Sequence, residues 1–145
     1  MERVRTVAAA LLIPPLLHLM ALDRLVRWLA PVRLPAKTRN DPPDEVIADW
    51  VTATLQVLPG PWRNTCLRRS VVLLHLLRRA GRPVLLCIGV RRSPSGEFTA
   101  HAWLLKDGQP YLEPQPSVPA DYTLIARFPE TTTTAPAPDA GRPAA

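Results

Sequence analysis

Thr-Cys-Leu-Arg-Arg-Ser, at residues 65–70, opens the helix on which the fold of this chain depends, and Phe-Thr-Ala-His-Ala-Trp follows at residues 98–103. The first block begins an apolar helical pattern, whereas the second has the residue types of a strand. A helix N-terminus stabilises an anion through unpaired N–H groups and the helix dipole, which suits a thiolate at Cys66. A histidine on a neighbouring strand can take the thiol proton and return it later. Cys66 and His101 are therefore the candidate nucleophile and base.

The segments around these blocks predict helices first and a small sheet after them. Apolar residues at spacings of three and four predict a helix over residues 44–58. The helix that starts near Cys66 is expected to run to about Ala80 and to stop at Gly81. Strands are predicted at residues 83–90, 98–105, 109–113 and 122–128, with no helical pattern between them, which argues against a parallel sheet. We therefore predict an α+β, papain-like domain in which the nucleophile helix packs on a small antiparallel sheet.

Composition limits the classes of function. The chain is 47% apolar and 6% aromatic, with a net charge of +6. Its arginines are spread in pairs without interleaved aromatics, so we expect a solvated surface and no nucleic-acid binding. Cys87 lies in an apolar run and is expected to be a buried, inert thiol, not a disulfide partner of Cys66. No C-x-x-C pair is present, so no metal or other cofactor is expected. A reduced, cytoplasmic protein fits these features.

The first 43 residues are predicted to form an apolar helical lead-in and a proline-rich linker. Pro14-Pro15 interrupts the apolar run too early for a membrane span, and no small-residue cleavage site of a signal peptide follows. We expect two short helices that pack on the domain or on a partner, with attachment to a lipid surface as the less favoured alternative. Residues 44–130 would form the catalytic domain, and residues 131–145 a disordered, low-complexity tail.

Four sequence blocks, in this order, resemble the transglutaminase-like cysteine proteases that remove leader peptides in bacterial lasso-peptide biosynthesis. They are Arg-Asn-Thr-Cys-Leu-Arg-Arg-Ser at residues 63–70, Leu-Leu-Arg-Arg-Ala-Gly-Arg-Pro at 76–83, Ile-Gly-Val-Arg-Arg at 88–92 and Ala-His-Ala-Trp at 100–103. The resemblance covers roughly residues 44–128. It implies a Cys-His-Asp triad, with Cys66 as nucleophile and His101 as base. At the position that matches the family's aspartate, this sequence has Glu113.

The hairpin after His101 decides whether Glu113 can reach the imidazole. If residues 106–108 form a three-residue loop with Gly108 left-handed, counting back places His101 opposite Glu113. The Cβ atoms of directly opposed residues lie about 4.5–5.5 Å apart, close enough for a carboxylate to orient the ring. A two-residue loop would instead put Glu113 on the other face. Asp107 lies about 20 Å along the strand from His101 and belongs to the turn.

Three further residues are candidates for supporting roles. Trp103 shares the face of His101 and would either shield the imidazole from water or belong to the core. An oxyanion hole would combine the backbone N–H of Cys66 with a second donor from Trp62 or Asn64, and the sequence leaves that choice open.

The resemblance implies that the chain cleaves a ribosomally made lasso-peptide precursor through a thioester that water hydrolyses. Acyl transfer by the same residues is one alternative. A catalytically degenerate scaffold that only binds peptide is another, suggested by glutamate in place of aspartate. The implied partners are the precursor's leader peptide, a separate leader-recognition protein that contacts the apolar N-terminal helices, and the macrocycle-forming cyclase.

Overall fold

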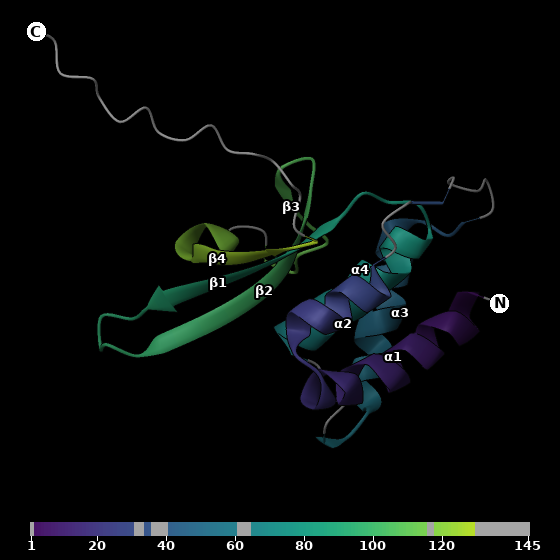
Figure 1. The fold of residues 1–145 in the computed structure, drawn as a ribbon, viewed down its shortest axis with the longest axis horizontal. Helices are drawn as coiled ribbons and strands as arrows, with labels where there is room; N and C mark the ends of the chain where they lie inside the picture. Colours follow the sequence, from purple (N-terminus) through teal and green to yellow (C-terminus); the bar gives the residue numbers. More distant parts are fainter. Residues whose placement is uncertain (1, 31–33, 36–40, 61–64, 116–117, 130–145) are drawn as a thin grey trace, which may run out of the picture.

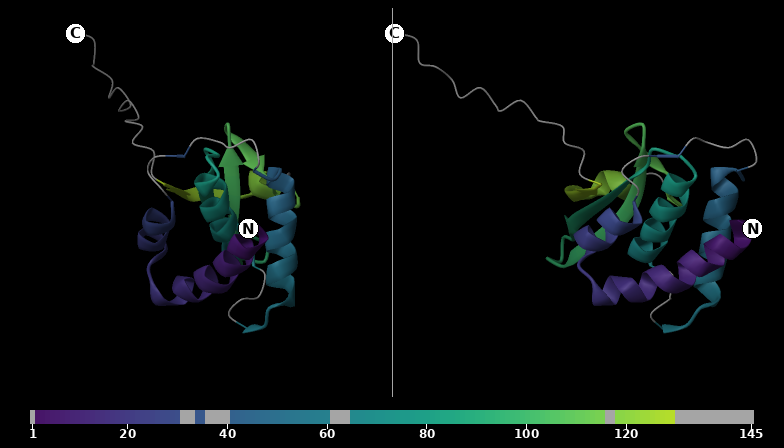
Figure 2. Two further views of the ribbon diagram at one scale, coloured as in Figure 1. Left: turned by 90° about the vertical axis from the view of Figure 1, so that its right-hand side faces the viewer. Right: turned by 45° about the vertical axis from the view of Figure 1, so that its right-hand side comes forward.

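The computed structural model describes residues 2–30, 34–35, 41–60, 65–115 and 118–129. Its helices are α1 (Glu2–Leu19), α2 (Leu22–Leu29), α3 (Asp44–Val57) and α4 (Cys66–Arg79). Its strands are β1 (Leu85–Arg92), β2 (Phe98–Lys106), β3 (Gln109–Tyr111) and β4 (Thr123–Phe128), with a short 3-10 helix at Val118–Asp121. The strands form an antiparallel sheet in the order β3-β2-β1-β4, and the helices gather to one side of it (Figure 1; Figure 2). The predicted α+β arrangement is confirmed.

Helix α4 forms the centre of the core and thereby fixes the position of its first residue, Cys66. Its fully buried side chains are Val71, Val72, Leu73, Leu74 and Leu77. They belong to one apolar cluster with Leu55 of α3, Leu86 of β1 and Leu104 of β2. Each such side chain stabilises the fold by about 1.5–3 kcal/mol relative to an exposed one. Gly81, in the left-handed conformation, follows the end of the helix as predicted.

The N-terminal segment forms two helices, but the expected break at Pro14-Pro15 is wrong. Helix α1 continues through both prolines to Leu19, and α2 begins only at Leu22. A proline inside a helix removes a backbone donor and costs about 3 kcal/mol or more. Here Ala10, Ile13 and Pro14 itself are buried, and α1 packs against both α3 and α4. This apolar burial offsets the lost helical hydrogen bonds.

A buried ionic network ties the start of α3 to the β2–β3 hairpin. The Arg82 guanidinium, only 3% exposed, donates to Asp44 Oδ1 at 2.7 Å and to Asp41 Oδ2 at 3.0 Å. The Tyr111 hydroxyl donates to the other oxygen of Asp44 at 2.7 Å, and Lys106 Nζ donates to that hydroxyl at 3.2 Å. Because Tyr111 ends β3, the network fixes the segment that leads to Glu113.

The charge of Asp44 is favoured in this setting. Burial by itself would raise the pKa of its carboxyl group. Hydrogen bonds from Tyr111 and Arg82, together with the positive charges of Arg82 and Lys106, outweigh burial and lower the pKa below its usual value. The ionised carboxylate is therefore the form that stabilises the fold.

The β2–β3 hairpin has a different register from the one predicted. Its loop has two residues, Asp107 and Gly108, with φ of 51° and 78°. Two consecutive positive φ values are typical of a type I′ turn. Lys106 therefore pairs with Gln109, and Leu104 pairs with Tyr111. The two-residue alternative is therefore the one that forms, and His101 is not directly opposite Glu113 across the ladder.

Candidate active site

Cys66 is the first residue of helix α4, as the sequence predicts. Thr65 is the N-cap, and its hydroxyl accepts from the backbone N–H of Arg68 at 3.3 Å. The other N–H groups of a first helical turn have no acceptor within the helix and stabilise negative charge nearby. The Cys66 side chain is half-buried and borders a pocket. This placement puts the sulfur at the start of the helix, where a substrate in the pocket can reach it.

His101 lies in the middle of β2 and contacts two aromatic rings. Its ring stacks on Trp103, with centroids 5.9 Å apart, and lies at a tilt to Tyr122, with centroids 5.4 Å apart. Gly89 is the cross-strand partner of His101 on β1. A Cβ there would lie 2.9 Å from atoms of both aromatic side chains, so the missing side chain permits their close approach. Trp103 is itself only 5% exposed, so it is buried and also stacks on the imidazole, and its supporting role in the reaction stays a prediction.

Glu113 reaches His101 in spite of the two-residue loop. Its Oε1 lies 3.3 Å from Nε2 of His101, and the two side chains are only 8% and 16% exposed. Strand β3 ends at Tyr111, and Leu112 has a φ of 54°. A left-handed residue interrupts the alternation of faces along an extended chain, which explains how Glu113 comes to the histidine. The predicted contact is present, although the register from which we predicted it is wrong.

The contact between Glu113 and His101 is close without being a good hydrogen bond. His101 Nε2 is buried, and no described residue gives it a well-aligned partner. The 3.3 Å separation exceeds the ~2.7–2.9 Å of a charge-assisted hydrogen bond, and the poor alignment agrees with a carboxylate one methylene longer than aspartate. Catalytic hydrogen bonds are often long or poorly aligned before substrate binds.

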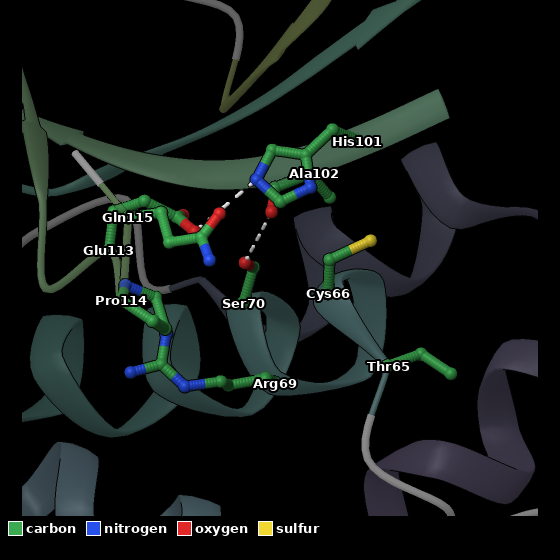
Figure 3. Close-up of a pocket in the computed structure, with 9 residues that line it drawn as sticks. All are labelled: Thr65, Cys66, Arg69, Ser70, His101, Ala102, Glu113, Pro114 and Gln115. Atoms are coloured by element: carbon green, nitrogen blue, oxygen red, sulfur yellow. Dashed lines mark hydrogen bonds and ion pairs between the residues drawn. The ribbon is translucent and has the colours of Figure 1, made fainter. Parts of the chain in front are cut away.

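One pocket of about 280 Å³ brings the three predicted residues together. Cys66, His101 and Glu113 line it together with Arg69 and Ser70 of α4. Figure 3 shows Nε2 of the imidazole directed at the carboxylate and the opposite edge of the ring, with Nδ1, on the side of Cys66. The cysteine and the carboxylate thus flank the ring from two sides. This is the arrangement that a base needs in order to serve a thiol while a carboxylate orients it.

A hydrogen bond joins the nucleophile helix to the histidine strand. Ser70, one turn beyond Cys66, is buried and donates from Oγ to the carbonyl oxygen of Ala102 at 3.0 Å. Strand β2 pairs with β3 only from Leu104 onward, so the Ala102 carbonyl lies outside that pairing and Ser70 supplies its hydrogen bond. The bond fixes the residue beside His101 with respect to the helix that carries the thiol.

The remaining predicted positions have separate outcomes. Trp62 and Asn64, the candidate oxyanion donors, lie outside the described residues. Cys87 is buried and, like Cys66, a free thiol, and burial raises its pKa. Throughout the part of the chain that the structure describes, no three histidine, cysteine, aspartate or glutamate side chains gather as metal ligands.

Sequence reasoning missed the residues that support the site. Arg69 and Ser70 follow Cys66 by three and four positions and therefore lie on its side of the helix. That spacing was visible in the sequence and could have marked them. Tyr122 approaches His101 only because β4 returns beside β1, and no local pattern around residue 122 indicates that contact.

Comparison with known proteins agrees with this geometry. A family profile described as the transglutaminase-like superfamily matches residues 16–127. No curated protein and no solved structure matches the chain. The matched region includes α2, α3, α4 and the whole pocket.

Among the described residues, no helix is both long enough and apolar enough to span a bilayer.

Proposed function

Because the chain belongs to the transglutaminase-like superfamily, we propose that it is a cysteine peptidase that removes the leader from a ribosomally made lasso-peptide precursor. The superfamily includes cysteine peptidases and acyltransferases. The observation that carries the proposal is that one pocket is lined by a cysteine at a helix start, a histidine and the buried carboxylate beside that histidine. The order of the four sequence blocks favours leader removal within this superfamily.

The proposed reaction uses the three residues in sequence. The Cys66 thiolate attacks the carbonyl carbon of the scissile bond while His101 is protonated, and the carbonyl oxygen takes the negative charge. The C–N bond then breaks, and the imidazolium gives its proton to the leaving amine of the core peptide. Water attacks the resulting thioester as His101 takes a proton from it, which releases the leader carboxylate and the thiolate. Glu113 stabilises the imidazolium throughout.

A partner is part of the proposal. At about 280 Å³ the pocket is slightly smaller than the usual range of ligand sites, so it would hold only the residues around the scissile bond. Val4, Leu12 and Leu19 of α1 and Trp28 of α2 are exposed apolar side chains. Exposed apolar surface of this kind marks protein interaction sites. We assign these helices to contact with a separate leader-recognition protein in the cytoplasm, with the cyclase as a further partner.

Acyl transfer is the second candidate. An amine in place of water would resolve the same thioester, and nothing about Cys66 or His101 separates the two outcomes. The poorly aligned contact of Glu113 favours a third candidate, a scaffold that binds peptide without cleaving it.

The test is incubation of the purified full-length chain with lasso-precursor peptides and a leader-binding protein, followed by mass spectrometry. Hydrolysis gives two fragments whose masses sum to the precursor plus one water, whereas acyl transfer gives a leader–amine adduct. We expect hydrolysis by the wild type and none by Cys66→Ala. Cleavage that survives this substitution contradicts the assignment of the nucleophile, and an intact precursor with the partner present supports the scaffold.

A further inference from the structure

Arg69, which lines the pocket, connects helix α4 with helix α3 and with the segment after β3. It lies on α4, three residues after Cys66, and its side chain is half-buried. Nε donates to Thr52 Oγ1 of α3 at 3.0 Å, and one terminal nitrogen donates to the carbonyl oxygen of Leu112 at 2.9 Å. Figure 3 shows the side chain running from the helix toward the segment that carries Glu113. None of these contacts reaches the thiol or the imidazole.

The carbonyl that Arg69 holds belongs to a strained residue. A left-handed φ is uncommon for a residue other than glycine and is strained. Leu112 keeps this conformation, with a φ of 54°. Its side chain packs against the core, and its carbonyl accepts the charged donor. Hydrogen bonds to charged groups are stronger than neutral ones and can offset strain of this kind. The conformation of Leu112 is what returns Glu113 to the face of His101.

Arg69 also acts on Glu113 through charge. Burial lowers the pKa of the guanidinium, and the negative charges of Glu113 and Asp49 act in the opposite direction. Both side chains line the pocket, so Glu113 supplies negative charge near the Arg69 cation. Asp49 of α3 is the other acidic residue that acts on this guanidinium.

We propose that Arg69 is a positioning residue that sets Glu113 against His101 by holding the left-handed turn at Leu112. The proposal rests on the function proposed above, because the contact of Glu113 with His101 matters only if His101 acts as the base for Cys66. Helix α4 would then carry the nucleophile and also position the residues that act on it. Arg69 fixes the residue before Glu113, just as Ser70 fixes the residue after His101. Hydrogen bonds from α4 therefore hold the positions of both His101 and Glu113 relative to Cys66.

The reactivity of Cys66 toward iodoacetamide tests this without any precursor. The full chain is alkylated at pH 6 and at pH 9, and the peptide that contains Cys66 is quantified by mass, which separates it from buried Cys87. An imidazolium partner keeps a thiol reactive at pH 6, whereas at pH 9 an ordinary thiol ionises without help. Wild type, His101→Ala, Glu113→Gln and Arg69→Lys are compared, with Arg79→Lys, an exposed position near the end of α4, as the matched control.

We expect Arg69→Lys to lower the Cys66 rate at pH 6 by about tenfold, the equivalent of one lost hydrogen bond to a charged group, with little change at pH 9. Lysine keeps the charge but lacks the fork that joins Thr52 to Leu112. If Arg69 acted only through its positive charge, Arg69→Lys would leave the alkylation rate at pH 6 unchanged. In a Glu113→Gln background the same substitution should add nothing, because the two residues act along one path. Arg79→Lys should match the wild type.

The outcomes separate the two proposals. Equal rates for wild type and His101→Ala at pH 6 contradict the proposed function. A wild type that depends on His101, with Arg69→Lys equal to it, overturns the role of Arg69. So does an equal loss from Arg69→Lys in the wild-type and Glu113→Gln backgrounds. If Arg69→Lys does not fold, Thr52→Val removes the second anchor of the guanidinium and should lower the pH 6 rate in the same direction. An unchanged rate in that variant also overturns the proposal.

Discussion

The ionic network around Asp44 and the candidate site around His101 are two polar clusters that differ in how completely their hydrogen bonds are made. In the ionic network, Arg82 donates to both Asp44 and Asp41, and Asp44 also accepts from Tyr111. In the candidate site, the buried Nε2 of His101 has a carboxylate at 3.3 Å but no well-aligned hydrogen bond among the described residues. The charged groups of the ionic network are hydrogen-bonded to one another, whereas Nε2 of His101 in the candidate site is not hydrogen-bonded to any described residue.

The difference separates a structural cluster from a candidate reactive one. Buried polar groups in folded proteins are nearly always paired, and each exception calls for an explanation. A base that must exchange protons with a thiol, an amine and water cannot be fully committed to its neighbours. Polar substitutions in the network should therefore change stability, and those in the site should change activity.

The largest effect is expected from His101→Ala. Loss of the base should lower the rate of precursor cleavage by about 10²–10⁴-fold. Loss of the aromatic contacts should cost only about 0.5–1.5 kcal/mol in the free energy of unfolding. Cleavage kinetics and urea unfolding on the same preparation measure both. A variant that unfolds readily but cleaves at the wild-type rate would reverse the assignment of the two clusters.

Arg82→Met should show the opposite behaviour. Removal of one partner from a buried ion pair costs about 3–5 kcal/mol, because Asp44 keeps a buried charge with fewer partners. Folded protein that remains should cleave the precursor within a few-fold of the wild type. Arg27→Met is the matched control, since Arg27 pairs with Asp23 at 2.8 Å on the exposed surface. That substitution should change the free energy of unfolding by no more than about 1 kcal/mol. Equal losses in the two variants would contradict a stabilising role for the buried network.

Acid should weaken the network by a smaller amount. The pKa of Asp44 is lower in the folded chain than in the unfolded one. Its contribution to stability is therefore complete above the unfolded value of about 3.9 and is lost as the pH falls through the lower folded value. Urea unfolding between pH 5 and pH 2 should show this loss, and Asp44→Asn should make the pH dependence shallower. The same slope in both proteins would show that other carboxylates account for it.

Much of the fold follows from local sequence patterns. The apolar periodicity of residues 44–58 and the stop at Gly81 gave helices α3 and α4 nearly at their observed ends, and β-rich runs gave the positions of the strands. The continuation of α1 through Pro14-Pro15 did not follow, because it depends on burial against two other helices.

The site was predicted in part. Cys66 and His101 followed from a helix start and a strand, each of which is local. The Asp-Gly pair at residues 107–108 favours a two-residue turn, so the true register was open to sequence reasoning. The left-handed Leu112 was not, because its conformation depends on a donor from Arg69, 43 positions away in the chain. Contacts of that kind appear only once the helix and the hairpin are packed together.

The central claim is that Cys66 forms a covalent bond with the leader. The most direct measurement mixes the full chain with precursor and leader-binding protein, quenches the reaction with acid within the first turnover, and determines the mass of the peptide that contains Cys66. We predict an increase equal to the leader minus one water, which is absent from Cys66→Ala. Leader release at the wild-type rate by Cys66→Ala, with no adduct on Cys66 in the wild type, would contradict it.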